Sequence, residues 1–123
     1  MTNPSVLLVD DERALRTVLR TRLRLAGYRV IETETGEDAL ELLEHEHPDV
    51  VLLDLRLPGI DGWEVLKQLR SSARLPALRV VVVTAHGGPE VAGRARALGC
   101  SAVLQKPFAL RELVSTLDKI VHS

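Results

Sequence analysis

Val50-Val51-Leu52-Leu53-Asp54 is an unbroken apolar run of strand length that ends in a carboxylate. Two other stretches share this pattern of an apolar run followed by polar residues, Val6 to Val9 and Val80 to Val83. Continuous apolar runs, rather than alternating ones, are typical of strands that are covered on both faces, as in a parallel sheet. The three stretches therefore predict strands of such a sheet.

Two weaker strands are predicted over Tyr28 to Glu32 and Ala102 to Gln105, and segments with helical periodicity separate all of the strands. A Thr35-Gly36-Glu37-Asp38 start, typical of a capping box, precedes the second helical segment. Five strand–helix units in succession predict an α/β fold, in which right-handed crossovers place helices on both sides of a parallel sheet.

The first helical segment carries an apolar face and, on another side, a stripe of arginines. The apolar face consists of Leu15, Val18, Leu19 and Leu23, and the stripe consists of Arg13, Arg16, Arg20 and Arg24. We interpret the stripe as a solvated surface, with docking to an acidic patch of a histidine-containing partner as the alternative.

Composition limits the function classes. The chain has 123 residues, of which 46% are hydrophobic, enough for one domain spanning residues 1–123. A net charge of −1 argues against a dedicated nucleic-acid binder, and the single cysteine, Cys100, excludes a disulfide framework and a multi-cysteine zinc site. No apolar run approaches the ~18 residues of a membrane span, and no signal peptide is visible. We therefore expect a cytoplasmic domain with no membrane insertion and, because the fifth helical segment reaches the end of the chain, no output domain.

Polar residues follow four of the predicted strands, at the edge where open parallel sheets bind ligands. Asp10 and Asp11 follow the first strand, Asp54 the third, Thr84 the fourth and Lys106 the fifth. Three crowded carboxylates repel one another. Lys106 supplies one compensating charge, and Mg²⁺, which prefers oxygen ligands, is the natural second partner.

Such a site suits a phosphoryl group, since an aspartate is a competent phosphoryl acceptor. Each residue also has a simpler interpretation. Asp10 or Asp11 alone would most often be the N-cap of the first helix, and Lys106 alone a solvated lysine. The joint placement of acids, hydroxyl and amine after successive strands favours the phosphoryl site.

Four segments carry a resemblance to a known family. They are Val9-Asp10-Asp11-Glu12, Leu53 to Gly62, Val83-Thr84-Ala85-His86 and Leu104-Gln105-Lys106-Pro107-Phe108. With them the chain resembles, over essentially all of its length, the receiver domain of two-component response regulators, and is similar to the single-domain chemotaxis type. This resemblance implies a flavodoxin-like fold with strand order 2-1-3-4-5.

The resemblance also implies a metal site and a phosphoacceptor. Asp54 would take a phosphoryl group from a phosphohistidine. Mg²⁺ would be bound by the carboxylates of Asp11 and Asp54 and by the backbone carbonyl of Arg56, and Asp10 would act through a metal-bound water. The domain would be a signalling module rather than an enzyme acting on an external substrate, limited to its own phosphorylation and slow dephosphorylation.

The remaining family positions concern the phosphoryl oxygens. By resemblance, Thr84 and the backbone N–H of Ala85 would contact these oxygens, and Lys106 would pair with the phosphoryl group. The Lys106–Pro107 bond would be cis, as in a tight turn. The partners implied are a histidine kinase or histidine phosphotransfer protein and an unidentified downstream protein, with no direct nucleic-acid contact.

The chain departs from the family pattern in two places. Val103 stands where receivers often carry an aromatic residue that swings inward, and Gly99-Cys100-Ser101-Ala102 stands where paired acids often support a charged dimer. The effect of phosphorylation is therefore expected to reach the surface of the domain through the loop after Thr84 and the fourth helix. We expect a monomer or a weak dimer.

Two residues are expected to tune the lifetime of the phosphorylated form. Arg56 and His86 lie two positions after the phosphoacceptor and the threonine, where the family's residues flank the path of the hydrolytic water. Both are large, and Arg56 is suited to covering phosphoryl oxygens. We expect the phosphoryl group to persist longer than in fast chemotaxis-type receivers.

Two other functions compete with the phosphoryl-accepting switch. One is a phosphorylation-independent interaction module that has kept the fold, which only Val103 favours. The other is a phosphatase of the haloacid-dehalogenase type, which needs a second aspartate two residues after its nucleophile. Arg56 occupies that position, so this alternative is weak.

Overall fold

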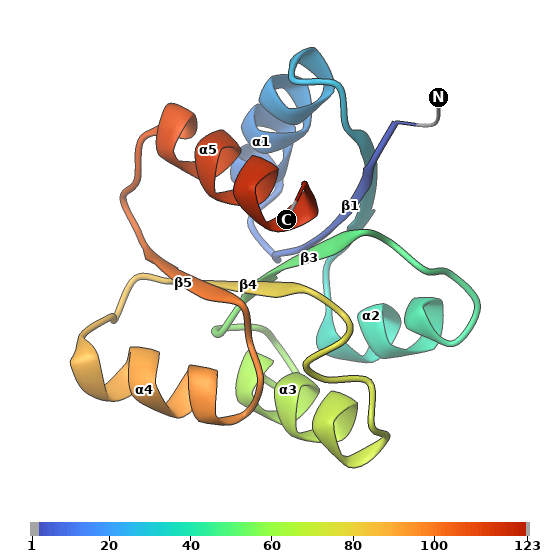
Figure 1. Ribbon diagram of the computed structural model, residues 1–123, viewed down its shortest axis with the longest axis vertical. Coiled ribbons are helices and arrows are strands. Elements are labelled where there is room, and N and C mark those ends of the chain that lie inside the picture. Colours follow the sequence, from blue (N-terminus) through green and yellow to red (C-terminus); the bar gives the residue numbers. More distant parts are fainter. Residues whose placement is uncertain (1–2, 123) are drawn as a thin grey trace.

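The computed structural model describes residues 3–122 and contains a five-stranded parallel sheet with helices on both faces (Figure 1). The strands are β1 (Ser5–Val9), β2 (Arg29–Thr33), β3 (Val50–Asp54), β4 (Val80–Thr84) and β5 (Ala102–Gln105). They lie in the order β2-β1-β3-β4-β5, and every neighbouring pair is parallel. The predicted α/β class, the flavodoxin-like fold and the strand order are confirmed. Only β2 is displaced, by one residue.

Five helices alternate with the strands. They are α1 (Arg13–Leu25), α2 (Gly36–Leu43), α3 (Gly62–Ser71), α4 (Pro89–Ala97) and α5 (Leu110–Val121). Figure 1 shows α1 and α5 on one face of the sheet and α2, α3 and α4 on the other. None of the helices within residues 3–122 is long and apolar enough to cross a membrane.

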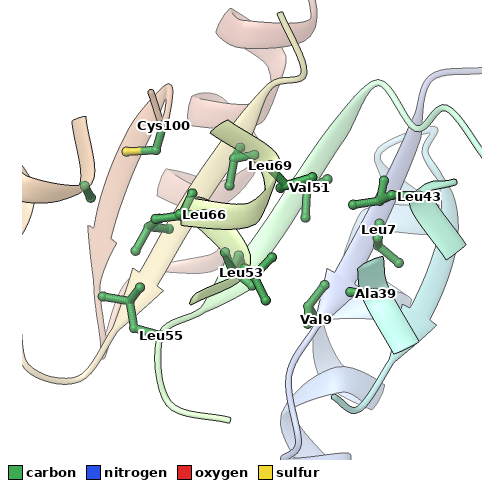
Figure 2. Close-up of a cluster of buried hydrophobic side chains, with 14 residues drawn as sticks. Leu7, Val9, Ala39, Leu43, Val51, Leu53, Leu55, Leu66, Leu69 and Cys100 are labelled. Carbon is green, nitrogen blue, oxygen red and sulfur yellow. The ribbon is translucent and has the colours of Figure 1, made fainter. Parts of the chain in front are cut away.

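The sheet separates two apolar cores, because successive side chains of a strand point to opposite faces. Val6 and Leu8 of β1 join the core beneath α1 and α5, whereas Leu7 and Val9 join the core beneath the other three helices. Figure 2 shows the second core, where Leu66 of α3 and other helical side chains cover the sheet. All residues of β1, β3 and β4 are buried, as the continuous apolar runs predicted.

The prediction for α1 is wrong in two respects. Val18, assigned to the apolar face, is 49% exposed, and Arg16, assigned to a solvated stripe, is only 7% exposed. Leu19 and Leu23 are buried as expected. Relative to the predicted orientation, the helix is rotated so that Arg16 contacts two acids at the end of β2, Glu32 and Glu34. The periodicity of α1 alone does not predict this contact.

The helix starts follow their local sequences. The Thr35 hydroxyl accepts a hydrogen bond from the Asp38 N–H at 3.1 Å, as predicted for the start of α2. At α1 the N-cap is Glu12 rather than Asp10 or Asp11, and it makes no side-chain capping bond. Both aspartates are therefore free of the capping role that either would most often have alone. The N-cap of α4 is Gly88, whose φ of 137° favours glycine.

Candidate functional site

The carboxyl ends of the strands place four predicted residues at one edge of the sheet. Asp54 and Thr84 are the last residues of β3 and β4, while Asp10 and Lys106 directly follow β1 and β5. The loop after β3 folds back tightly, because α3 begins with Gly62 against it. A Cβ at Gly62 would lie 2.5 Å from the Asp54 carbonyl oxygen, so only glycine permits this approach.

Three carboxylates and one amine meet at this edge. The acids Asp10, Asp11 and Asp54 each offer an oxygen within 4.8 Å of the others. Asp10 and Asp54 are buried and Asp11 is exposed. The Lys106 Nζ donates to Asp54 Oδ2 at 2.9 Å and to Asp10 Oδ2 at 3.2 Å. One cation thus bridges the two buried acids.

The pKa values of Asp10 and Lys106 follow from this geometry. Burial raises the pKa of Asp10, while a hydrogen bond from the Glu12 N–H and the charge of Lys106 oppose the rise. Burial acts to lower the pKa of Lys106, but its hydrogen bond to Asp54 and the charges of Asp10 and Asp54 outweigh burial and raise it. Lys106 is therefore held in its charged form.

The donor set fits a hard divalent cation. Three carboxylates face one lysine, so an excess of negative charge remains, and carboxylate oxygens are ligands that Mg²⁺ prefers. Within residues 3–122, Asp11 has no hydrogen bond or ion pair and is available as a ligand. Arg56 lies beside the acids, since its backbone N–H donates to Asp54 Oδ1 at 2.9 Å. Its side chain is exposed.

The hydroxyl side of the site is built by the β4–α4 loop. Thr84 is 3% exposed, and its hydroxyl oxygen accepts from the His86 N–H at 3.1 Å. Ala85 and His86 are exposed. The Lys106 N–H donates to the Thr84 carbonyl at 2.8 Å, which joins the ends of β4 and β5. The Lys106–Pro107 bond is cis, as the resemblance implied.

A cleft of about 920 Å³ opens over these residues. Its lining includes Asp11, Glu12, Asp54, Arg56, Trp63, Thr84, Ala85, His86 and Lys106. Asp10 does not line the cleft and lies beneath it. The Trp63 ring is covered by the Arg94 guanidinium of α4, 4.0 Å from the ring centroid.

Two residues near the site escaped prediction. Glu12 places a fourth carboxylate 4.0 Å from Lys106 Nζ, and Arg16 donates to the Asp10 carbonyl at 2.6 Å. Glu12 follows the acid pair directly and was open to the same strand-end argument. The signal for Arg16 was the acidic end of β2, where Glu32 and Glu34 stand.

Val103 is the second residue of β5. It lies opposite Val82 of β4 in the register and packs, half-buried, against the core beneath α2, α3 and α4. Cys100 is a free, buried thiol in the same core. Burial raises the pKa of Cys100, which disfavours the reactive thiolate.

Comparisons with known proteins agree with this geometry. The family model for the response regulator receiver domain matches residues 6–118 of this chain. The chain is 38% identical to the probable transcriptional regulator ycf27 of Guillardia theta, over 98% of this chain and 46% of that protein. It is 33% identical to sporulation initiation phosphotransferase F of Bacillus subtilis, over 97% of this chain and 94% of that protein. It spans about half the length of several ycf27 regulators that it matches.

Solved structures show the same likeness. A putative response regulator from Chloroflexus aurantiacus superposes with a TM-score of 0.90 at 32% identity, over 100% of each chain. The receiver domain of the Francisella response regulator 1452 superposes with a TM-score of 0.92 at 27% identity, over 98% of each chain. With its sheet order and family match, the chain belongs to the receiver domain family of two-component response regulators.

Proposed function

We propose that this domain is a phosphoryl-accepting switch in which Asp54 takes the phosphoryl group of a phosphohistidine. The observation that carries the proposal is the bridge from Lys106 to Asp54 and Asp10, at 2.9 and 3.2 Å, beside a third carboxylate. In the transfer, a carboxylate oxygen of Asp54 forms a bond to phosphorus as the bond from phosphorus to the imidazole nitrogen breaks. The partner's imidazole leaves with that electron pair.

The metal proposed for this step is Mg²⁺. The carboxylates of Asp11 and Asp54 and the backbone carbonyl of Arg56 would hold it, with Asp10 acting through a bound water. When bound, Mg²⁺ supplies positive charge to the phosphoryl oxygens, and phosphoryl transfer depends mainly on such neutralisation and positioning. Lys106 is already charged beside Asp54 and supplies a second positive charge to the same oxygens.

The proposed output begins at the β4–α4 loop. The Thr84 hydroxyl and the Ala85 N–H would bind phosphoryl oxygens, which requires the hydroxyl to turn its hydrogen away from the His86 carbonyl, to which it donates at 3.4 Å. Because Val103 has no ring to move, we propose that the displacement passes through this loop into α4. The exposure of Ala85 and His86 and the glycine cap of α4 support that route.

Arg56 and His86 are proposed to lengthen the life of the phosphorylated state. Both are exposed and line the mouth of the cleft over Asp54. Neither is an acid or amide suited to orienting water for attack, and an attacking water must be positioned before its charge can be stabilised. Shielding therefore outweighs the help that the Arg56 charge could give to hydrolysis.

The proposed partners are a histidine kinase or a histidine phosphotransfer protein and a downstream protein that binds near α4. The proposed setting is cytoplasmic, because a single cysteine allows no intramolecular disulfide. Within residues 99–102 no acid precedes Val103 to support a charged dimer face, which favours a monomer or weak dimer.

The test is to incubate the chain with a small acyl phosphate and Mg²⁺ and to count the phosphoryl groups by intact mass spectrometry. One group is expected on the wild type and none on Asp54→Ala. Asp38→Asn is the matched control, because Asp38 is an exposed acid on α2 outside the cleft. Undiminished labelling of Asp54→Ala would refute the acceptor. A wild type that stays unlabelled with and without a phosphohistidine donor would favour the phosphorylation-independent interaction module instead.

A further inference from the structure

Arg16 is a buried cation close to the acid cluster. Its side chain is 8% exposed, although arginine is rarely buried without partners. Its Nη1 donates to the Asp10 carbonyl oxygen at 2.6 Å. Its Nε lies 3.4 Å from a carboxylate oxygen of Glu32, and its Nη2 lies 3.0 Å from one of Glu34. One side chain thus joins α1, the β1–α1 loop and the end of β2.

The Asp10 backbone is held from both sides. Its N–H donates to the Thr33 carbonyl at 3.2 Å, and its own carbonyl accepts from Arg16. Because a peptide unit is planar, fixing the Asp10 carbonyl also fixes the direction in which the chain continues to Asp11. Within residues 3–122, the Asp11 side chain has no hydrogen-bond or ion-pair partner of its own, so its backbone alone directs it toward Asp54.

We propose that Arg16 is a positioning residue for the metal site, holding the Asp10–Asp11 segment so that both carboxylates face Asp54. This role rests on the proposed Mg²⁺ binding. Groups that orient metal ligands without touching the metal commonly change its affinity by roughly 10- to 100-fold when they are lost. Glu32 and Glu34 orient Arg16 in turn, and Glu32 also accepts from Arg20 at 2.7 Å.

Simple electrostatics predicts the opposite sign. Removing a positive charge close to three carboxylates should strengthen their attraction for a cation. Loss of positioning should weaken cation binding in spite of that gain. The direction of the change in Mg²⁺ affinity therefore separates a positioning role from a purely electrostatic one.

The experiment titrates the ¹⁵N-labelled chain with MgCl₂ alone and follows the backbone amides of the β1–α1 loop and the Trp63 indole. Arg16→Gln should weaken Mg²⁺ binding by roughly 10-fold or more. Arg20→Gln is the matched control, because it removes the same charge from the same helix and a contact with the same Glu32, yet it does not touch Asp10. Its Mg²⁺ affinity should be unchanged or slightly higher. Arg16→Lys keeps the charge without the forked geometry and should fall between the wild type and Arg16→Gln.

A second measurement needs no metal. The Glu12 N–H donates to Asp10 Oδ1 at 2.8 Å, so its hydrogen exchange reports on the loop. Exchange should be faster in Arg16→Gln than in the wild type or Arg20→Gln. If Arg16→Gln fails to fold, Arg16→Lys should show the same two changes at smaller size.

The outcomes keep the two proposals apart. Unchanged loop exchange together with equal or tighter Mg²⁺ binding in the Arg16 variants would overturn the positioning role. Weakening of equal size in Arg20→Gln would overturn it too, because the effect would then belong to charge on α1. A wild type without any Mg²⁺-dependent shift would instead overturn the proposed metal site, and amide exchange would still test whether Arg16 holds the loop.

Discussion

The two sides of the cleft are held in place by different means. On the acid side, α1 buries Arg16, Leu19 and Leu23 against the sheet, and Arg16 ties down the loop that carries Asp10. On the hydroxyl side, α4 buries only Ala95 within its bounds. Its polar contacts with α3 are at the surface.

The surface contacts between α3 and α4 are one cation–π contact and one hydrogen bond. Arg94 covers the Trp63 ring, and Arg70 of α3 donates to the Ala97 carbonyl at 2.7 Å. A metal site needs ligands that are already in position, whereas a switch needs a segment that moves at small cost. Under the proposed function, the domain would divide these two requirements between the α1 side and the α4 side of the cleft.

Truncation of one apolar side chain on each wall gives the largest expected contrast. Leu23→Ala in α1, at a fully buried position, should lower the free energy of unfolding by about 2–5 kcal/mol. Val91→Ala in α4, at a half-buried position, should lower it by about 1 kcal/mol. Urea denaturation of both variants measures the contrast. Equal losses would remove the claimed difference between the walls.

A smaller effect is expected where α5 contacts the residue that precedes β2, on the face of the sheet that α1 also covers. The Tyr28 hydroxyl donates to Asp118 Oδ1 at 2.7 Å, so Tyr28→Phe should cost about 1 kcal/mol at neutral pH. Burial, together with the Asp118 hydrogen bond and charge, raises the pKa of Tyr28 above its ordinary 10.0.

The sign of the pH dependence follows from that shift. Above about pH 10 the unfolded chain releases the phenol proton while the folded chain keeps it, so stability falls as pH rises. The advantage of the wild type over Tyr28→Phe should be complete below pH 10 and shrink above it. Because the chain has one tyrosine, the phenylalanine variant is its own control. An advantage that does not change with pH would contradict the assignment.

The smallest effect concerns the open mouth of the cleft. If Arg56 shields the phosphoryl group, Arg56→Asn should lose it roughly two- to tenfold faster, which corresponds to about 1.4 kcal/mol or less of barrier height. Arg24→Asn removes an exposed arginine from α1 and serves as the control. Unchanged or slower loss from Arg56→Asn would mean that the side chain is idle or assists the water.

Much of the fold was predictable because the strong signals were local. The continuous apolar runs within β1, β3 and β4 predict strands covered on both faces, and a parallel arrangement then brings Asp54 and Lys106 to one edge. The order itself came from resemblance to the family, because periodicity does not say which strands are neighbours. The same holds for the cis bond before Pro107.

The errors arose where tertiary contacts override a helical pattern. Arg16 looks like part of a solvated stripe within α1, and only the facing Glu32 and Glu34 of the β2 end make its burial favourable. Rotating α1 to satisfy these pairs turns Val18 outward, to 49% exposure. The sequence pattern of α1 does not show that the end of β2 lies beside this helix. It therefore could not predict the contacts of Arg16 with Glu32, Glu34 and the Asp10 carbonyl.

The hydrogen bond between Lys106 and Asp10 spans 96 positions of the chain. Contacts of such separation form only after long segments of chain have been closed, so they arise late in folding. In a nascent chain that includes the three aspartates but not yet Lys106, the repulsion between the carboxylates would not be compensated by the lysine charge. The proposed phosphoryl transfer would therefore require a chain that has been synthesised and folded through β5, because only then does Lys106 lie beside Asp54.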